Sequence, residues 1–139
     1  MLRRICCILL LSIACCGFRH GVVEDLTGDE DLSLFKLISV RGMRDGDHLS
    51  MQAAVSDSSS TLSVNMRFAV GAPTKLETGT WNWTRPQTTL MDTGQIAARS
   101  VTFLGGQDGP PSIGGSFELL SPEGTPRYRL RLPVTEVKR

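Results

Sequence analysis

Apolar and polar residues alternate along two neighbouring stretches in the middle of the chain. The apolar positions are Leu49, Met51, Ala53 and Val55 in the first stretch, and Leu62, Val64, Met66, Phe68 and Val70 in the second. Successive side chains of a strand point to opposite faces of a sheet. The segment between the two stretches, residues 57–60, reads Asp-Ser-Ser-Ser and is typical of a turn. The pattern therefore predicts an antiparallel hairpin with one buried face.

Shorter runs predict five further strands. They cover residues 34–41, 78–84, 95–104, 116–120 and 127–134. The first run also fits one face of a helix. Residues 105–111, GGQDGPP, cannot continue a regular element and predict a loop. About seven strands at fairly even spacing predict an all-β fold, namely a single antiparallel β-sandwich or small barrel.

The last two runs predict a hairpin whose register is set by its apolar face. The expected pairs are Leu120 with Arg127, Leu119 with Tyr128, Glu118 with Arg129 and Phe117 with Leu130. A shift by one residue would move an arginine into the core, so this register is strongly favoured.

Arg127, Arg129 and Arg131 fall on the outer face of the last strand in this register. Such a row can bind a phosphate or an anionic lipid surface. It is more typical of the solvent face of an edge strand, where charge prevents edge-to-edge pairing. Pro133 also favours the edge position, because proline cannot donate to a strand ladder.

The chain begins with a short apolar run behind two basic residues. The run from Ile5 to Ala14 holds ten residues, whereas a membrane-spanning helix needs about 20. A basic start at Met1–Arg4, a short apolar region and small residues at Ser12 and Ala14 are the anatomy of a secretory signal. We therefore expect residues 1–14 to be a cleaved signal peptide.

The residues at the end of this run, Ser12-Ile13-Ala14-Cys15, resemble the lipobox of bacterial lipoproteins. The resemblance covers about a tenth of the chain, and Ser12 stands where the family usually has leucine. It implies that Cys15 becomes the lipid-bearing N-terminus of an exported protein anchored at the cell envelope. Two alternatives stay open: cleavage before Cys16, and plain secretion after cleavage by the ordinary signal peptidase.

Cysteine usage and charge narrow the classes of function further. All four cysteines lie within the first 16 residues, so the rest of the chain has no internal disulfide, thiolate zinc site or catalytic cysteine. Loss of the signal leaves 125 residues, one domain by length, with 13 basic and 14 acidic residues. This balance points to no nucleic-acid partner. We expect residues 15–32 to be an acidic flexible tether and residues 33–139 to be the β-sandwich domain.

One motif suggests an enzyme. Residues 90–94, LMDTG, resemble the active-site loop of retroviral-type aspartic proteases, which implies that Asp92 is catalytic. Such enzymes need two carboxylates that share a proton. Asp-x-Gly is also ordinary turn chemistry, and we expect a turn here.

Trp81 and Trp83 lie two residues apart and therefore on one strand face. Exposed, they would form a sugar-stacking platform of a carbohydrate-binding module. Large aromatic residues more often build the core, and we expect the two tryptophans there.

The remaining candidate ligands are sparse. His20 and His48 are isolated, and a turn explains the acidic residues near His48, Asp45 and Asp47. We therefore expect no metal, no cofactor and no catalytic residue. The sequence favours a non-catalytic binding or structural domain, with an envelope protein or polysaccharide as its partner.

Overall fold

The computed structural model describes residues 21–84, 92–105 and 109–139. These residues form eight strands and no helix. In chain order the strands are β1 (Val23–Asp25), β2 (Lys36–Asp45), β3 (His48–Ser56), β4 (Thr61–Ala69), β5 (Lys75–Thr84), β6 (Asp92–Leu104), β7 (Ser112–Leu120) and β8 (Pro126–Glu136).

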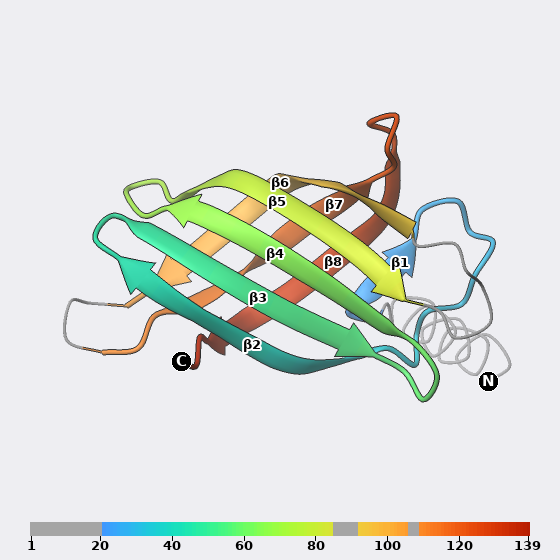
Figure 1. The fold of residues 1–139 in the computed structure, drawn as a ribbon, viewed down its shortest axis with the longest axis horizontal. Coiled ribbons are helices and arrows are strands. Elements are labelled where there is room, and N and C mark those ends of the chain that lie inside the picture. Colours follow the sequence, from blue (N-terminus) through green and yellow to red (C-terminus); the bar gives the residue numbers. More distant parts are fainter. Residues whose placement is uncertain (1–20, 85–91, 106–108) are drawn as a thin grey trace, which may run out of the picture.

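The strands form one antiparallel sheet in the order β1-β8-β7-β6-β5-β4-β3-β2. The sheet curls into a half-barrel, so that β2 and β3 pass across β7 and β8 in Figure 1. The predicted all-β class and antiparallel pairing are confirmed. The structure has eight strands rather than about seven, and the predicted sandwich or small barrel is not confirmed.

The central hairpin has the predicted turn and apolar face. β3 and β4 pair without a shift from His48↔Ala69 to Ser56↔Thr61. All the predicted apolar positions except Val70, which is partly exposed, are buried. The carboxylate of Asp57 closes the turn by accepting hydrogen bonds from the backbone N–H groups of Ser59 (2.8 Å) and Ser60 (2.7 Å). These bonds stabilise the charged form and lower the pKa of Asp57.

β6, β7 and β8 approach one another closely because Gly114 and Gly115 carry no side chain. A Cβ atom on Gly115 would lie 2.1 Å from the carbonyl oxygen of Ser100, and one on Gly114 would lie 2.7 Å from the backbone nitrogen of Val134. The register shifts at this place on both sides of β7. Such bulges bend a strand and increase its twist, which contributes to the curl of the sheet. Residues 112–115 thus belong to β7, which starts before the strand predicted from residue 116.

The part of the expected tether that the structure describes differs from the expectation. Residues 23–25 form β1 and pair with Tyr128–Leu130 of β8. Val23 and Leu32 are buried. Asp25 holds the loop after β1, because its carboxylate accepts hydrogen bonds from the N–H groups of Thr27 (2.9 Å) and Glu30 (3.0 Å). The sequence does not predict this strand because Glu24 and Asp25 are acidic, and the apolar contacts come from neighbouring residues such as Val23 and Leu32.

The last hairpin has the predicted register over three pairs. Phe117 pairs with Leu130, Glu118 with Arg129 and Leu119 with Tyr128. Leu120 pairs with Pro126 instead of Arg127, because the register shifts at the end of β7. The edge position predicted for β8 is wrong over Tyr128–Leu130, because β1 covers that side of the strand.

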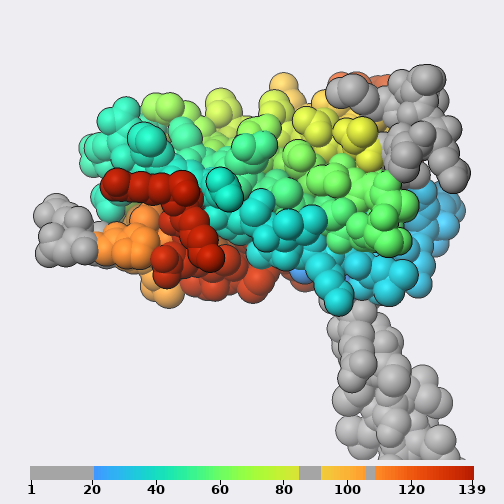
Figure 2. Space-filling model, turned by 60° about the horizontal axis from the view of Figure 1, so that its bottom comes forward, coloured from blue at the N-terminus to red at the C-terminus, as the bar shows by residue number. Residues whose placement is uncertain are grey.

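The residues after β8 cross to the far edge of the sheet and meet β2. Lys138 donates its N–H to the carbonyl of Val40 (3.1 Å) and accepts from the N–H of Gly42 (2.8 Å). Val137 is buried beside them and donates its N–H to the carbonyl of Pro111 (2.8 Å). We call the last residue of β8 and the three residues after it, residues 136–139, the closing segment. Figure 2 shows this red end of the chain lying against the teal surface of β2 and β3.

Candidate functional site

The half-barrel has two ends of different character, and the end near β1 is filled with aromatic rings. Phe35, Trp81, Trp83 and Tyr128, which we call the aromatic end, pack edge to face with centroid distances of 5.1–5.6 Å. Trp81 is 1% exposed and Trp83 is 2% exposed. The predicted core position of the tryptophans is confirmed. Buried rings cannot stack on a sugar at the surface, so the basis for a carbohydrate platform at these residues is lost.

Asp92 and Gly94 of the LMDTG motif lie in a strand. They begin β6 and pair with Trp83 and Trp81 of β5, so the turn predicted at this point is wrong. A Cβ atom on Gly94 would lie 1.8 Å from the carbonyl oxygen of Leu120. The indole N–H of Trp81 donates to that same carbonyl (2.8 Å), directly beside Gly94. Gly94 therefore has a structural role: the absence of a side chain leaves space for the hydrogen bond that links β5 to the end of β7.

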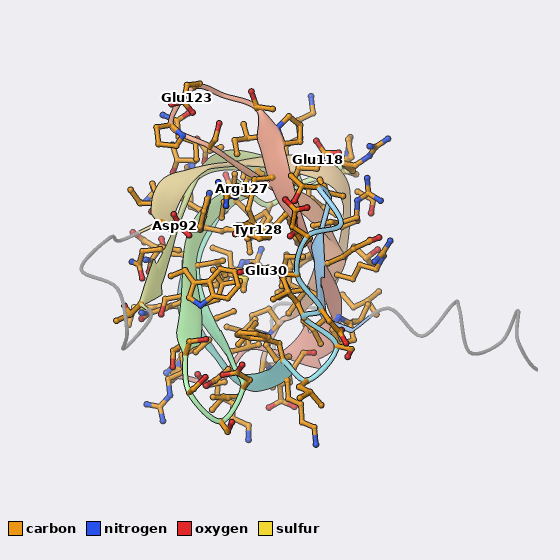
Figure 3. The ribbon with its side chains drawn as sticks, turned by 90° about the vertical axis from the view of Figure 1, so that its right-hand side faces the viewer. Glu30, Asp92, Glu118, Glu123, Arg127 and Tyr128 are labelled. Carbon is orange, nitrogen blue, oxygen red and sulfur yellow. The ribbon has the colours of Figure 1, made fainter. Side chains whose placement is uncertain are left out.

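Asp92 lies close to a cation at the rim of the aromatic end. Arg127 donates its Nε–H to the hydroxyl of Tyr128 (3.2 Å), and Figure 3 shows both residues at this opening together with Asp92. The bond to Tyr128 raises the pKa of Arg127, and the charges of Asp92 and Asp25 raise it further. The surroundings of Asp92 thus include an arginine, whereas a protease of the aspartic type uses a second carboxylate that shares its proton.

Two members of the arginine row have acidic partners on the outer face of β8. Arg131 pairs with Glu24 of β1 (2.9 Å), and Arg129 lies 3.6 Å from Glu118 of β7, which also binds Arg99 (2.8 Å). These two carboxylates offset part of the charge of the row. Arg129 and Arg131 are therefore members of cross-strand ion pairs.

The predicted turn before His48 is present as a tight hairpin. Asp45 pairs with His48, and Gly46 adopts a φ of 58° that suits glycine in a two-residue connection. His48 itself pairs with Glu77 of β5 (2.9 Å). Cys15 and His20 lie outside the described residues.

The part of the chain that the structure describes holds no group of three or more His, Cys, Asp or Glu side chains suited to a metal ion. The same residues contain no helix that is long and apolar enough to cross a bilayer.

The other end of the half-barrel is hollow. A pocket of about 880 Å³ opens between the β2–β3 hairpin, the start of β7 and the closing segment. We call it the mouth pocket. The residues that line it include Met43, Arg44, Pro110, Pro111, Val137 and Arg139. Its walls are fixed by the backbone hydrogen bonds that tie the closing segment to β2 and to Pro111.

Arg44 is held in place at the rim of this pocket. Its Nε–H donates to the carbonyl of Gly46 (3.1 Å), and its guanidinium carbon lies 5.7 Å from the centre of the Phe103 ring. Among the described residues, its two terminal nitrogens have no hydrogen-bond or ion-pair partner. β2 and β6 are not neighbours in the sheet, so Arg44 reaches across the mouth of the half-barrel.

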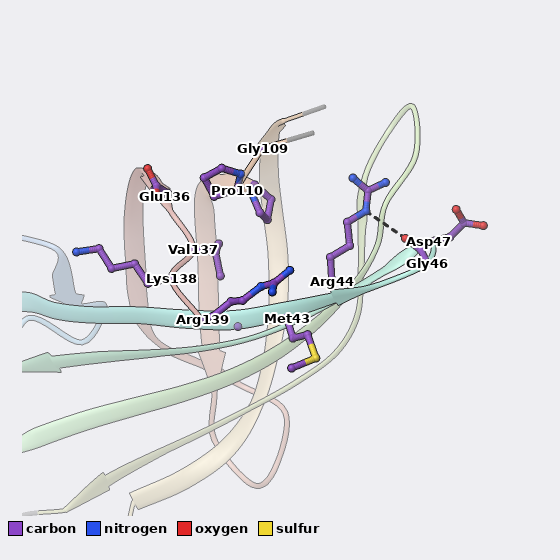
Figure 4. A pocket seen from close by; sticks show the side chains of 12 residues that line it. Met43, Arg44, Gly46, Asp47, Gly109, Pro110, Glu136, Val137, Lys138 and Arg139 are labelled. Carbon is purple, nitrogen blue, oxygen red and sulfur yellow. Dashed lines mark hydrogen bonds between the residues drawn. The ribbon is translucent and has the colours of Figure 1, made fainter. Parts of the chain in front are cut away.

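The charged side chains of the pocket wall point in different directions. In Figure 4 the side chain of Arg139 extends into the space below Pro110 and toward Arg44, whereas Lys138 and Asp47 point away from it. The side chains that reach the hollow are thus those of two arginines beside Pro110 and Pro111, whereas Met43 points to the opposite side of β2 (Figure 4).

Sequence reasoning missed the mouth pocket. Arg44 reads as one charged residue of a turn, and nothing in its spacing links it to Phe103 or to residues 136–139. The contacts that form the pocket join segments from opposite ends of the chain.

A scan against protein-family models, a search of curated proteins and a search of solved structures each return no match to this chain.

Proposed function

We propose that this chain is an exported protein, anchored by a lipid at a bacterial cell envelope, whose β-domain acts by binding and not by catalysis. The anchor part of the proposal rests on one observation, the short apolar run that ends in Ser12-Ile13-Ala14-Cys15. The binding part rests on the mouth pocket, which is walled by tied backbone and contains arginine nitrogens with no partner among the described residues. Both parts are consistent with a domain whose enzyme-like motif has a structural explanation at Gly94.

The position of the pocket suits an anchored binding protein. β1 pairs with Tyr128–Leu130 near the start of β8, whereas the closing segment follows the end of that strand. A strand rises about 3.3 Å per residue, so the pocket lies roughly 20 Å further along β8 than β1 does. In Figure 1 the blue start of the described chain and the C-terminus accordingly lie at opposite ends of the molecule.

The short length of chain between Cys15 and the domain also supports this orientation. Gly21, the first described residue, is six residues after Cys15. Six residues span at most about 20 Å. A lipid on Cys15 would therefore keep the β1 end near the membrane and present the pocket on the side away from it.

The anchor is tested by the mass of the mature N-terminus. We would express the full chain in a bacterium, isolate the membrane fraction and measure the N-terminal peptide by mass spectrometry. The proposal predicts a peptide that starts at Cys15 and carries diacylglycerol. Cys15→Ser should abolish the modification and Cys16→Ser should leave it intact.

The alternative processing sites give different masses. Lipid on Cys16 would move the cleavage site by one residue and retain the anchor. An unmodified N-terminus in the soluble fraction would contradict the anchor and favour plain secretion.

A further inference from the structure

We propose that the mouth pocket binds an anionic ligand whose oxyanion group is held by the terminal nitrogens of Arg44 and whose apolar part lies against Pro110 and Pro111. This inference rests on the binding role proposed above and names the chemical class that the site accepts. The oxyanion is a carboxylate or a phosphate, because the planar guanidinium fork suits both.

The first reason is that Arg44 is already in a binding geometry. Arginine carries five N–H donors in a fixed fork. The Nε–H of Arg44 is used by the carbonyl of Gly46, and the ring of Phe103 fixes the guanidinium from one side. The four N–H donors of the terminal nitrogens have no partner among the described residues. A ligand oxyanion can therefore bind without first displacing a protein carboxylate, and little side-chain freedom is lost.

The second reason is the charge that surrounds Arg44. Two acidic residues, Asp47 and Glu136, also line the pocket. Asp47 points away from the hollow, while Arg139 points into it (Figure 4). A second cation strengthens the attraction for an anion, and the effect is screened by salt. The contrast with Arg129 and Arg131 is direct, because those arginines are paired with Glu118 and Glu24.

The third reason is the apolar wall, which makes a bare ion a poor match. Ligand sites are mostly apolar, with a few placed polar groups that fix orientation. Pro110 and Pro111 supply the apolar surface. A ligand with an anionic head and a short apolar part uses both features of the pocket.

The proposal is tested by calorimetric titration of small probes into the chain from residue 15 to 139, which retains every described residue. The probes are hexyl phosphate, hexanoate, inorganic phosphate and the uncharged control hexanol. We expect hexyl phosphate or hexanoate to bind at one site, at least about tenfold more tightly than hexanol, and more weakly as salt is raised. Comparison of the two charged probes distinguishes a phosphate from a carboxylate as the preferred head group, and inorganic phosphate measures the contribution of the apolar part.

Three variants locate the binding. Arg44→Gln should weaken the charged probes at least about tenfold, and Arg44→Lys should also weaken them because it keeps the charge but loses the fork. Lys36→Gln removes the same charge from the other end of β2 and should leave the affinity unchanged. Circular dichroism of each variant checks that the fold is retained.

Two results would overturn the proposal in different ways. Equal binding of hexanol, or an unchanged affinity in Arg44→Gln, would overturn the anionic ligand while leaving the pocket as a binding site. Failure of every probe to bind would overturn the ligand class together with the binding role, whereas the anchor is decided separately by the mass of the N-terminus.

Discussion

The two ends of this half-barrel are made by the same strands and use their space in opposite ways. At the β1 end, Phe35, Trp81, Trp83 and Tyr128 fill the opening with rings that are buried and in mutual contact. At the other end the strands leave a pocket of about 880 Å³, closed on one side only by the residues after β8. The polar groups of the two ends also differ. At the filled end the indole N–H of Trp81 donates to the carbonyl of Leu120, whereas at the hollow end the terminal N–H groups of Arg44 have no partner among the described residues.

This difference indicates where stability and function lie in the domain. Filling the β1 end with large aromatic residues removes a large apolar area from water and makes that end the stable part of the fold. The hollow end buries less apolar surface, and its arginine keeps terminal N–H donors that no described residue uses. We therefore expect substitutions at the two ends to separate cleanly into effects on stability and effects on binding.

The largest expected effect is that of Trp83→Ala. Trp83 is 2% exposed and contacts Phe35 and Tyr128, so its removal leaves a cavity among rings. We expect a loss of about 3–5 kcal/mol in the free energy of unfolding, measured with urea. Met43→Ala at the mouth pocket is the control and should stay within about 0.5 kcal/mol of the wild type. Equal losses at the two ends would break the comparison.

Leu130→Ala should follow closely, since Leu130 is fully buried between β1 and β7. The expected cost is about 2–5 kcal/mol, again from a core cavity. Its neighbour on the outer face gives the contrast, because Arg129 forms a partly buried pair with Glu118 outside the apolar core. Arg129→Ala should cost under about 1 kcal/mol by the same urea measurement. A neutral Leu130→Ala with an unfolded Arg129→Ala would mean that the two faces of β8 are inverted.

Gly42→Ala should have an intermediate effect confined to the hollow end. A Cβ atom at this position would lie 2.4 Å from the carbonyl oxygen of Ser50 and 2.9 Å from the side chain of Val137. Crowding of this kind costs about 1–3 kcal/mol. Because Val137 would have to move, we also expect faster amide exchange at Val137 and Lys138, measured by NMR. Unchanged exchange there would show that the closing segment does not depend on Gly42.

The smallest expected effect concerns Asp25 and pH. Burial raises the pKa of Asp25, but the hydrogen bonds from Thr27 and Glu30 and the charge of Arg127 outweigh it and lower the pKa below 3.8. Because the folded pKa is depressed, the carboxylate contributes stability above pH 3.8 that is lost as the pH falls through the folded value. Asp25→Asn should therefore be less stable than the wild type at pH 7, and the gap should shrink below about pH 4. Thermal unfolding between pH 7 and pH 2.5 measures it, and a gap that is constant with pH would contradict the assignment.

Sequence patterns predicted the hairpins, in which two strands that are neighbours in the chain pair in a register set by their own alternation of apolar and polar residues. The β3–β4 hairpin and three pairs of the last hairpin follow from uninterrupted alternation, because a shift would reverse both faces. β1 was missed because two of its three residues are acidic, while its stability comes from contact with β8. The strand predicted from residue 116 starts too late, because Gly114 and Gly115 have no apolar side chain and their close approach to neighbouring strands is a property of the curled sheet.

The candidate site was less accessible to prediction than the fold. The roles expected for the tryptophans and for the outer face of β8 follow from local pattern, whereas the mouth pocket needs Arg44, Phe103 and the closing segment to meet. No local pattern encodes a contact between Gly42 and Lys138, since each residue is ordinary in its own surroundings. Only the curvature of the whole sheet brings them together.

The most direct test of the contrast between the two ends is a map of backbone amide shifts during titration with hexyl phosphate. The account predicts that the amides that move lie at the hollow end, in residues 42–47, 109–113 and 136–139, and that the amides of Trp81, Trp83 and Tyr128 stay in place. Shifts centred on the aromatic end, with the hollow end unchanged, would contradict the assignment of binding to the mouth pocket.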